Sequence, residues 1–336
     1  MAKSARSKAK SVGQSTKRNQ TKSSKGAASN SDAVNTRAPT DPLSTVNNPA
    51  TVDEPGTVDQ PGTATRSKTQ GSASANNARV LKEPPIILIT NDDGVTAPGI
   101  RNLVEAVKDL GKIVVVAPDK PQSGMGHAIT IGQPLRLQKV EGFSDVESWS
   151  CSGTPVDCVK LAVDKVLHRK PDICLSGINH GANHSINVIY SGTMSAAMEA
   201  AIESIPSVGF SLLDHSIDAD FTGARKYANL IIKDLLGRKL DKHLLLNVNV
   251  PAIDVNLIKG AKLCRQAYAK YEENFLERDD PTGRKYFWLT GEFVNFDKGR
   301  DTDVWALKNN YVSVVPVQFD LTNYVLKSKF EKNWKL

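Results

Sequence analysis

Short apolar runs alternate with amphipathic segments along the chain from residue 86 onward. The first run, residues 86–90, shows no polar alternation, which predicts a parallel strand covered on both faces. Residues 99–110 place apolar side chains at helical spacing, and residues 113–117 form a second apolar run. A strand, a helix and a strand in this order favour a right-handed parallel crossover, so the loops after the two strands should open side by side.

The same alternation continues to residue 250 and predicts an α/β fold. Short strands are expected at residues 135–140 and 146–151, and Thr154 and Pro155 are the residue types that start a helix. The other elements expected in this part are strands at 173–176, 206–213 and 244–250, and helices at 194–202 and 220–236.

Beyond residue 250 the pattern changes. Segments 262–268 and 285–289 are β-like and are joined by a charged turn at 277–283, which predicts a projecting β-hairpin, or arm, within about 257–295. Such an arm is a typical contact between subunits. A short helix at 302–308 and a strand at 311–317 are expected after it.

Residues 1–82 differ in composition from the rest of the chain, and we expect them to be a disordered tail. They are rich in Ser, Thr, Ala, Asn, Lys and Pro and show no apolar clusters at helix or strand spacing. They hold 13 of the 43 basic and 5 of the 36 acidic residues, which leaves 30 basic and 31 acidic residues in 83–336. The folded domain, expected at 83–336, is therefore nearly neutral, and contact with nucleic acid is conceivable for the basic tail alone.

The tail also bears on localisation. Up to Ser31 it has eight basic residues and no acidic residue, which partly resembles an organellar transit peptide. A solvated tail on a cytoplasmic protein is the main interpretation, and an organellar address is the alternative. No stretch approaches the roughly 20 apolar residues of a membrane span, so no membrane partner is expected. The four cysteines form no CxxC pair, which favours reduced thiols in the core.

Polar residues follow three of the predicted strands. Asp92 and Asp93 come directly after the first strand, Ser123 follows the second, and Asn179 follows the strand at 173–176. Paired carboxylates could cap the next helix, but with a hydroxyl and an amide they form a set of hard oxygen donors that suits Mg²⁺ or Mn²⁺. Zinc stays open because His127 is near in sequence, and His127 could also act as an acid or base.

A second polar segment lies at a helix start. Ser191, Gly192 and Thr193 precede the Ala-rich helix at 194–202 and offer backbone N–H groups and hydroxyls to an anionic oxygen. A cation, a helix N-terminus and hydroxyl donors together predict chemistry on a phosphate group. A metal that polarises the phosphate and activates a water would hydrolyse a phosphate ester.

Six segments in order make the chain resemble the SurE family of survival proteins, metal-dependent 5′/3′-nucleotidases. They are NDDGVTAPGI, VVVAPDKPQSGMGHAIT, GTPVDCV, SGINHGAN, YSGT and DTDVWALKNNYVSVVPVQFDLT, and they span about residues 86–325. The resemblance implies a Rossmann-like, mostly parallel sheet flanked by helices, with a C-terminal hairpin exchanged in homodimers or homotetramers. It implies nucleoside monophosphates as substrates.

The resemblance also assigns roles to residues. It implies one divalent cation held by Asp92, Asp93, Ser123 and Asn179, and a phosphate bound by Asn183, Ser191, Gly192 and Thr193. Asp93 is the candidate base for the water, because ionisable groups within reach are needed there. The segment His184-Ser185-Ile186-Asn187 departs from the glycine and acidic residues that many relatives carry, which puts substrate preference in doubt.

Three other functions compete with this one. A haloacid dehalogenase would need a nucleophilic Asp at position 91, where this chain has Asn91. A broader phosphatase or exopolyphosphatase and a non-catalytic nucleotide-binding protein stay as alternatives. We expect His180, His184 and His215 to be loop histidines, and Asp119 and Asp157 to shape a turn and a helix start.

Overall fold

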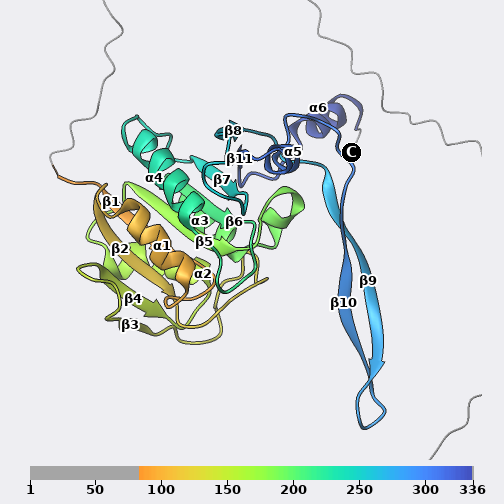
Figure 1. Cartoon of the computed structure of the whole chain (residues 1–336), viewed down its shortest axis with the longest axis horizontal. Helices are drawn as coiled ribbons and strands as arrows, with labels where there is room; N and C mark the ends of the chain where they lie inside the picture. The colour runs from red at the N-terminus through yellow and green to blue at the C-terminus, as the bar shows by residue number, and fades with distance from the viewer. Residues whose placement is uncertain (1–82, 335–336) are drawn as a thin grey trace, which may run out of the picture. The chain divides into compact units, whose positions relative to one another are not determined.

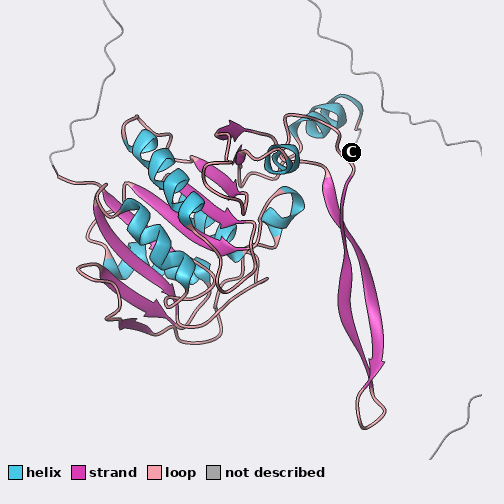
Figure 2. Ribbon diagram, viewed as in Figure 1, coloured by secondary structure: helices cyan, strands magenta, loops and turns pink. Residues whose placement is uncertain are grey.

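The computed structural model describes residues 83–334, and residues 1–82, where the disordered basic tail was predicted, lie outside this part. A nine-stranded sheet runs through it (Figures 1 and 2). Six neighbouring strands are parallel, whereas β3 pairs antiparallel with β4 and β11 pairs antiparallel with β7 and parallel with β8. The strand order is β3 (Leu137–Lys139), β4 (Glu147–Cys151), β2 (Lys112–Pro118), β1 (Ile86–Thr90), β5 (Ile173–His180), β6 (Ser207–Leu212), β7 (Leu245–Val250), β11 (Val312–Pro316) and β8 (Ala261–Leu263).

Helices cover both faces of this sheet (Figure 1). On one face, Ile87 and Ile89 of β1 belong to a core formed with α1 (Pro98–Val107) and α4 (Thr222–Leu236). On the other face, Leu88 packs with α2 (Pro155–Leu161) and α3 (Gly192–Ile202). The absence of polar alternation in β1 thus has the predicted cause, because successive side chains enter two different cores. The α/β fold with a mostly parallel sheet is confirmed.

Several element bounds differ from the prediction. The helix that starts after Thr154 has apolar residues at helical spacing as far as Leu167, but after Leu161 it changes to a short π-helical segment, η1 (Ala162–Val166). Strand β5 does not end at Ser176 but continues to His180, with a register shift against β6 between Ser176 and Asn179. Asn179 therefore lies in a strand rather than in a loop. The loop that follows contains a 3₁₀ helix, η2 (Ser185–Ile189).

The predicted hairpin exists, but its first strand was misplaced. It is formed by β9 (Ala269–Asp279) and β10 (Lys285–Asn295), which pair along their whole length (Figure 2). Segment 262–268 instead contains the short strand β8, which belongs to the main sheet. The charged turn is correspondingly shorter, because β9 runs to Asp279.

The C-terminal part holds two helices. Helix α5 (Asp303–Lys308) lies where it was expected, and Thr302 caps it by accepting a hydrogen bond from Trp305 N. Helix α6 (Tyr324–Asn333) was not predicted, since none of its side chains is buried and its apolar pattern is weak.

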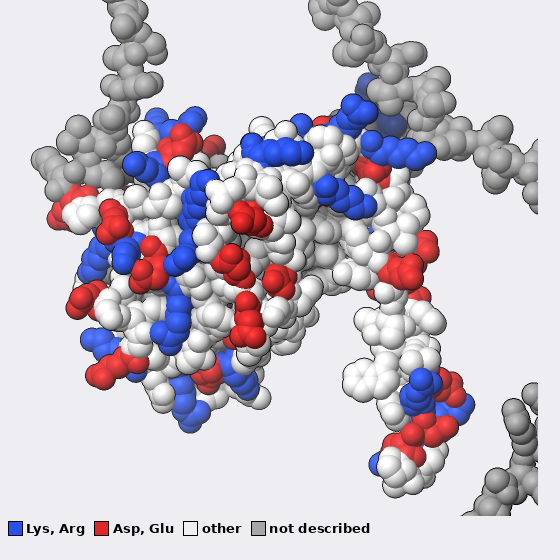
Figure 3. Space-filling model, in the orientation of Figure 1, with Lys and Arg blue, Asp and Glu red and all other residues white. Residues whose placement is uncertain are grey.

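Charge and cysteine expectations can also be compared with the described residues. On the face drawn in Figure 3, basic and acidic side chains are interspersed rather than gathered by sign, which fits the near-neutral count. Among residues 83–334 no helix has the length and apolar character needed to cross a membrane. All four cysteines are free and buried, as predicted.

Candidate functional site

The site lies where the strand order of the sheet changes direction. From β1 the chain adds β2 on one side, and β5, β6 and β7 follow on the other. Ligands of open α/β sheets bind at such points, outside the carboxyl ends of the strands. The turn after β1 and the end of β5 supply Asp92, Asp93 and Asn179 to this place.

Asn91 builds the turn that presents the two carboxylates. Its side-chain Nδ2 donates to Gly94 O at 2.9 Å, and its Oδ1 accepts from Gly94 N at 3.2 Å. Gln122 N donates to Asp92 O at 2.7 Å, which ties the loop carrying Ser123 to the same turn. Asn91 thus has a structural role that an aspartate could not fill in the same way, because a carboxylate has no N–H to donate.

Asp92 is almost fully enclosed, with 4% of its surface exposed. Thr193 Oγ1 donates to its Oδ1, and a Cβ on Gly192 would lie only 2.7 Å from Asp92 Cβ and 2.9 Å from Oδ2. Burial raises the pKa of Asp92 to about 6, the nearby charge of Asp93 adds to the shift, and the bond from Thr193 opposes it. Burial makes the ionised form of this carboxyl group costly in free energy, and a positive charge bound beside it would offset that cost.

Asp93 is less enclosed than Asp92. Its Oδ2 accepts a long hydrogen bond from His180 N at 3.4 Å. Burial raises its pKa as well, while that bond and the charge of His180 act in the opposite direction. The pKa of both adjacent carboxyl groups is therefore raised above that of free aspartate, chiefly because both groups are buried.

Asn179 is oriented by its own amide nitrogen. Its Nδ2 donates to His180 O at 3.1 Å and to Gly181 O at 2.8 Å. Because both N–H groups are used in this way, the side-chain oxygen is the atom left to face the pocket. Ser123 lies in an exposed loop position and lines the same pocket.

The start of helix α3 closes the other side of the site. Ser191 is its N-cap and accepts a hydrogen bond from Met194 N at 3.0 Å, so its hydroxyl proton remains available to a ligand. Asn183 donates one N–H to Ser211 Oγ at 2.8 Å, and its backbone N donates to Asn249 Oδ1 at 2.7 Å. Asn183 and Ser191 are thus both held rigidly by neighbouring groups.

One pocket of about 700 Å³ joins these groups, a volume in the range of small-molecule sites. Six of the eight predicted site residues line it. The other two, Gly192 and Thr193, lie behind Asp92 and touch it instead. The sequence did not predict that the hairpin of β9 and β10 forms one wall of this pocket. The residues that line the pocket are Asp92, Asp93, Ser123, Gly124, Asn179, His180, Gly181, Ala182, Asn183, Asn187, Tyr190, Ser191, His215, Tyr271, Glu273, Leu289, Thr290 and Gly291.

The comparison with known proteins agrees with this architecture. The family model described as "Survival protein SurE" matches residues 87–273. The chain belongs to the SurE family. A SurE relative from Christiangramia forsetii, named "5'-nucleotidase SurE", is 61% identical over 244 residues, which are 72% of this chain and 94% of the relative. A relative of the same name from Flavobacterium psychrophilum is 59% identical over 239 residues, 71% of this chain and 93% of that protein.

A solved SurE structure has the same fold. The crystal structure of the Sure protein from Aquifex aeolicus is 40% identical in sequence and superposes with a TM-score of 0.65, covering 74% of this chain and 99% of that chain. The resemblance to the SurE family that the six sequence segments carry is therefore confirmed.

His127 of this SurE chain does not line the pocket. Its Nε2 lies 2.8 Å from Oε2 of Glu199, whose other oxygen is bonded to Lys160 Nζ. The Glu199 side chain is 4% exposed, whereas His127 and Lys160 are more accessible. Glu199 thus fastens the loop after β2 to α2 and α3.

Among the described residues no group of three or more His, Cys, Asp and Glu side chains is arranged to hold a metal.

Replacing Glu199 with Gln should lower the free energy of unfolding at pH 7 by about 1 to 2 kcal/mol, because the buried carboxylate is lost from its ion pair with Lys160 and its hydrogen bond with His127. Burial favours a higher pKa for Glu199, but the bonds from His127 and Lys160 outweigh it and hold the pKa below its ordinary value. Such a group stabilises the fold above its unfolded pKa, and this stabilisation is lost as the pH falls through the folded value.

Urea unfolding of both proteins between pH 7 and pH 3 measures this effect. The difference should shrink below about pH 4. The control is Glu203→Gln, whose side chain is 36% exposed and lies 3.7 Å from Lys170. A difference for Glu199→Gln that stays constant down to pH 3 would show that the ion pairs do not hold the loop.

Asp157 shapes the start of helix α2, as predicted. Asp157 Oδ2 accepts from Thr154 N at 2.9 Å in a capping box, and its Oδ1 accepts from Thr130 N at 3.1 Å.

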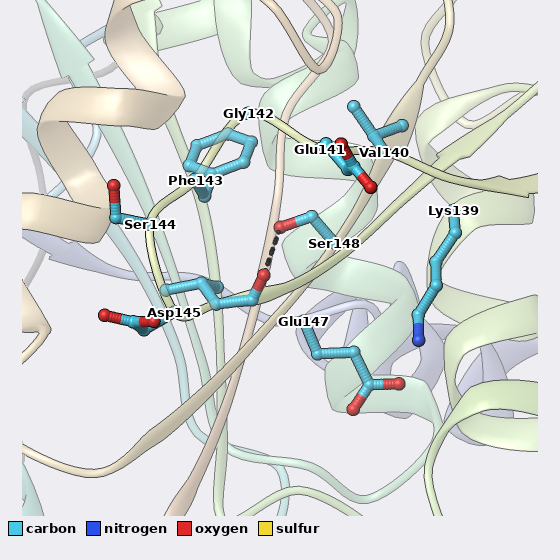
Figure 4. Close-up of a pocket in the computed structure, with 10 residues that line it drawn as sticks. Lys139, Val140, Glu141, Gly142, Phe143, Ser144, Asp145, Glu147 and Ser148 are labelled. Carbon is cyan, nitrogen blue, oxygen red and sulfur yellow. Dashed lines mark hydrogen bonds between the residues drawn. The ribbon is translucent and has the colours of Figure 1, made fainter.

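A second hollow lies at residues 139–148, between β3 and β4 (Figure 4). Its ionisable side chains do not converge, since Asp145 points to one side and Lys139 and Glu147 lie at the other. The one hydrogen bond drawn there joins Ser148 Oγ to Val146 O at 3.0 Å. This hollow therefore lacks the convergent polar groups of a catalytic site.

Proposed function

We propose that this chain is a 5′-nucleotidase, a phosphoric monoester hydrolase that removes phosphate from nucleoside 5′-monophosphates. The observation that carries the proposal is the meeting of two carboxylates, Asp92 and Asp93, with the N-terminus of helix α3 in one pocket. The names of the relatives support it, since both bacterial SurE proteins above are named 5'-nucleotidases. Hydrolysis of 3′-monophosphates belongs to the proposal as a second activity.

The residues around the acidic pair fit one divalent cation, Mg²⁺ or Mn²⁺. Among residues 83–334 neither Asp92 nor Asp93 forms an ion pair with a Lys or Arg side chain, and the two amide N–H groups of Asn179 are used in bonds to backbone oxygens, which leaves its side-chain oxygen to accept. With the hydroxyl of Ser123 they make four oxygen donors of the kind that hard cations prefer. When bound, the cation supplies Lewis-acid chemistry, by neutralising phosphate charge and lowering the pKa of a coordinated water.

The phosphate would lie against the start of α3. The hydroxyl of Ser191 and the backbone N–H of Gly192, at the first turn of α3, are donors for its oxygens. Asn183 adds the second N–H of its amide. Thr193, which the family resemblance assigns to the phosphate, gives both its hydroxyl and its backbone N–H to Asp92, so it would act on the phosphate by positioning that carboxylate.

Asp93 is the proposed general base. It is the more accessible carboxylate of the pair, and its raised pKa brings it nearer to the range of an effective base. Asp92 is committed to Thr193 and is less able to move a proton. The reaction needs no covalent enzyme intermediate, in agreement with Asn91 at the position of a nucleophilic Asp.

A substrate panel tests this proposal. The full-length protein should release phosphate from 5′-AMP, GMP, CMP and UMP with added Mg²⁺ or Mn²⁺, and EDTA should reduce the rate by at least about a hundredfold because charge neutralisation is lost. Inorganic tripolyphosphate and p-nitrophenyl phosphate distinguish a nucleotidase from an exopolyphosphatase or a broad phosphatase. Binding of nucleotides without any phosphate release would favour the non-catalytic alternative.

Organisation and location complete the proposal. Residues 83–336 would form one SurE-like phosphohydrolase domain that assembles into a homodimer or homotetramer through its hairpin, and residues 1–82 would be a tail on a cytoplasmic protein. Light scattering measures the assembly. Imaging of the tagged full chain beside one lacking residues 1–82 decides between the cytoplasmic and organellar alternatives, and phosphatase activity that survives this deletion would assign catalysis to the domain.

A further inference from the structure

The hairpin supplies a wall of the pocket that no predicted site residue accounts for. Tyr271 and Glu273 of β9 line the pocket together with Leu289 and Gly291 of β10. Glu273 pairs with Gly291 across the two strands. Residues opposite each other in an antiparallel pair share a face, so alternate residues of both strands point the same way. One face of the hairpin is therefore turned toward the site.

Aromatic contacts hold this face in place. The rings of Tyr271 and Phe293 are 5.4 Å apart in an edge-to-face arrangement, and Phe293 contacts His184 in the same way at 4.9 Å. Ser185 Oγ lies 2.9 Å from Ala267 O and 3.0 Å from Ala269 O and shares its one proton between them, which binds the start of β9 to the loop before α3. The hairpin wall and the phosphate side of the pocket are thus joined by direct contacts.

Gly291 lets the two strands approach each other closely at this wall. Its φ is +154°, and a Cβ there would meet Glu272 O at 2.5 Å, so no other residue fits without strain. Because Gly291 has no side chain opposite Glu273, the carboxylate of Glu273 and the ring of Tyr271 are the polar groups that β9 brings to this part of the pocket. An aromatic ring such as that of Tyr271 can pack against a flat ligand ring.

Glu273 is the charged group at this space. Its exposed side chain forms no ion pair or hydrogen bond with any other residue in 83–334, whereas Asp297, two residues after β10, is bonded to Arg265. We propose that Glu273 recognises the base of the nucleotide by accepting hydrogen bonds from N–H groups on the base edge, with Tyr271 beside the ring. This inference rests on the proposed nucleotidase function and names the substrate class of that site.

Charge sets the orientation of the substrate in the pocket. A phosphate dianion is repelled by Glu273 and attracted by the N-terminus of α3, so the phosphate lies at α3 and the base at the hairpin. A carboxylate has two acceptor oxygens and no donor, and it matches an edge with two adjacent N–H groups best. Guanine offers N1–H and the 2-amino group, whereas hypoxanthine offers N1–H alone. GMP should therefore be preferred over IMP.

The ratio of kcat/KM for GMP to that for IMP measures this recognition in the full-length protein. We expect the ratio to be about tenfold, the value of one charge-assisted hydrogen bond at a partly solvated site. In Glu273→Gln the ratio should fall below about twofold, since an amide has one acceptor oxygen and adds a donor that meets N1–H. A ratio also cancels any general gain in affinity that comes from removing a negative charge.

Glu272→Gln is the matched control. Glu272 precedes Glu273 on β9, pairs with Glu292 and lies on the opposite face of the hairpin. It should leave the ratio unchanged and should alter hydrolysis of p-nitrophenyl phosphate by no more than about twofold, because Glu272 does not line the pocket. Thermal unfolding confirms that both variants are folded.

The outcomes separate the two proposals. If GMP is hydrolysed but the wild-type ratio is near one, or if Glu273→Gln keeps the wild-type ratio, base recognition by Glu273 is wrong and the nucleotidase function stands. If no phosphate ester is hydrolysed with Mg²⁺ or Mn²⁺, the proposed function fails, and this inference fails with it.

Discussion

Replacing Asp92 with Asn should reduce kcat/KM for nucleoside monophosphates by at least about a thousandfold, since one charged group of a preorganised site is removed. The fold should not weaken. Asn keeps an oxygen that accepts the hydrogen bond from Thr193, and it removes a charge that burial and Asp93 both disfavour. Without added metal, the temperature of unfolding of the variant should therefore equal or exceed that of the wild type.

Asp119→Asn provides the control for this experiment. Asp119 is an exposed carboxylate directly after β2, in the same loop as Ser123, and does not line the pocket. It should retain activity within about twofold, as surface substitutions away from a site do. Full activity of Asp92→Asn would sink the assignment of this carboxylate to the site.

Replacing Gly192 with Ala should reduce kcat/KM by about a hundredfold, because displacement of a catalytic group by about 1 Å has an effect of this size. The added Cβ would lie 2.7 Å from Asp92 Cβ, and the Asp92 backbone is tied to Gln122, so the carboxylate has to shift. Ala is a better helix former than Gly, which partly offsets the strain at this first position of α3. The variant should therefore fold.

Gly237→Ala, at the end of α4, is the matched control, because an added Cβ there meets only backbone oxygens at 3.4 Å and 3.6 Å. A steady-state assay on GMP with saturating Mg²⁺ compares both variants with the wild type. Equal activity in Gly192→Ala would show that the position of Asp92 is not limiting.

Local sequence was sufficient for the parts of the fold that depend on local pattern. Strand β1 and its acidic turn, the cap at Thr154 and the helix after Ser191 were all predicted from residue type and spacing, since caps and buried strands have strong local signals. Strand β9 was misplaced because its residues are nearly all exposed, which leaves no burial pattern to read. Helix α6 was missed for the same reason.

The candidate site was predictable at its strand ends and unpredictable where distant segments meet. Asp92 and Asp93 could be predicted as site residues because they directly follow an apolar run that forms a buried strand. The contact of Thr193 with Asp92 spans 101 residues and that of His127 with Glu199 spans 72, and single-sequence patterns carry no information on such pairs. Glu273 lies on a strand of the hairpin whose place beside the pocket depends on contacts of Ser185 with the start of β9.

Titration of the metal-free protein with Mn²⁺, followed by calorimetry, tests the central claim most directly, because it measures the cation site without relying on turnover. The account predicts one Mn²⁺ per chain for the wild type and for Asp119→Asn, and a loss of affinity of at least about a hundredfold in Asp92→Asn, since a hard-oxygen site depends on its charged ligands. Unchanged Mn²⁺ affinity in Asp92→Asn, or no binding to the wild type, would contradict it.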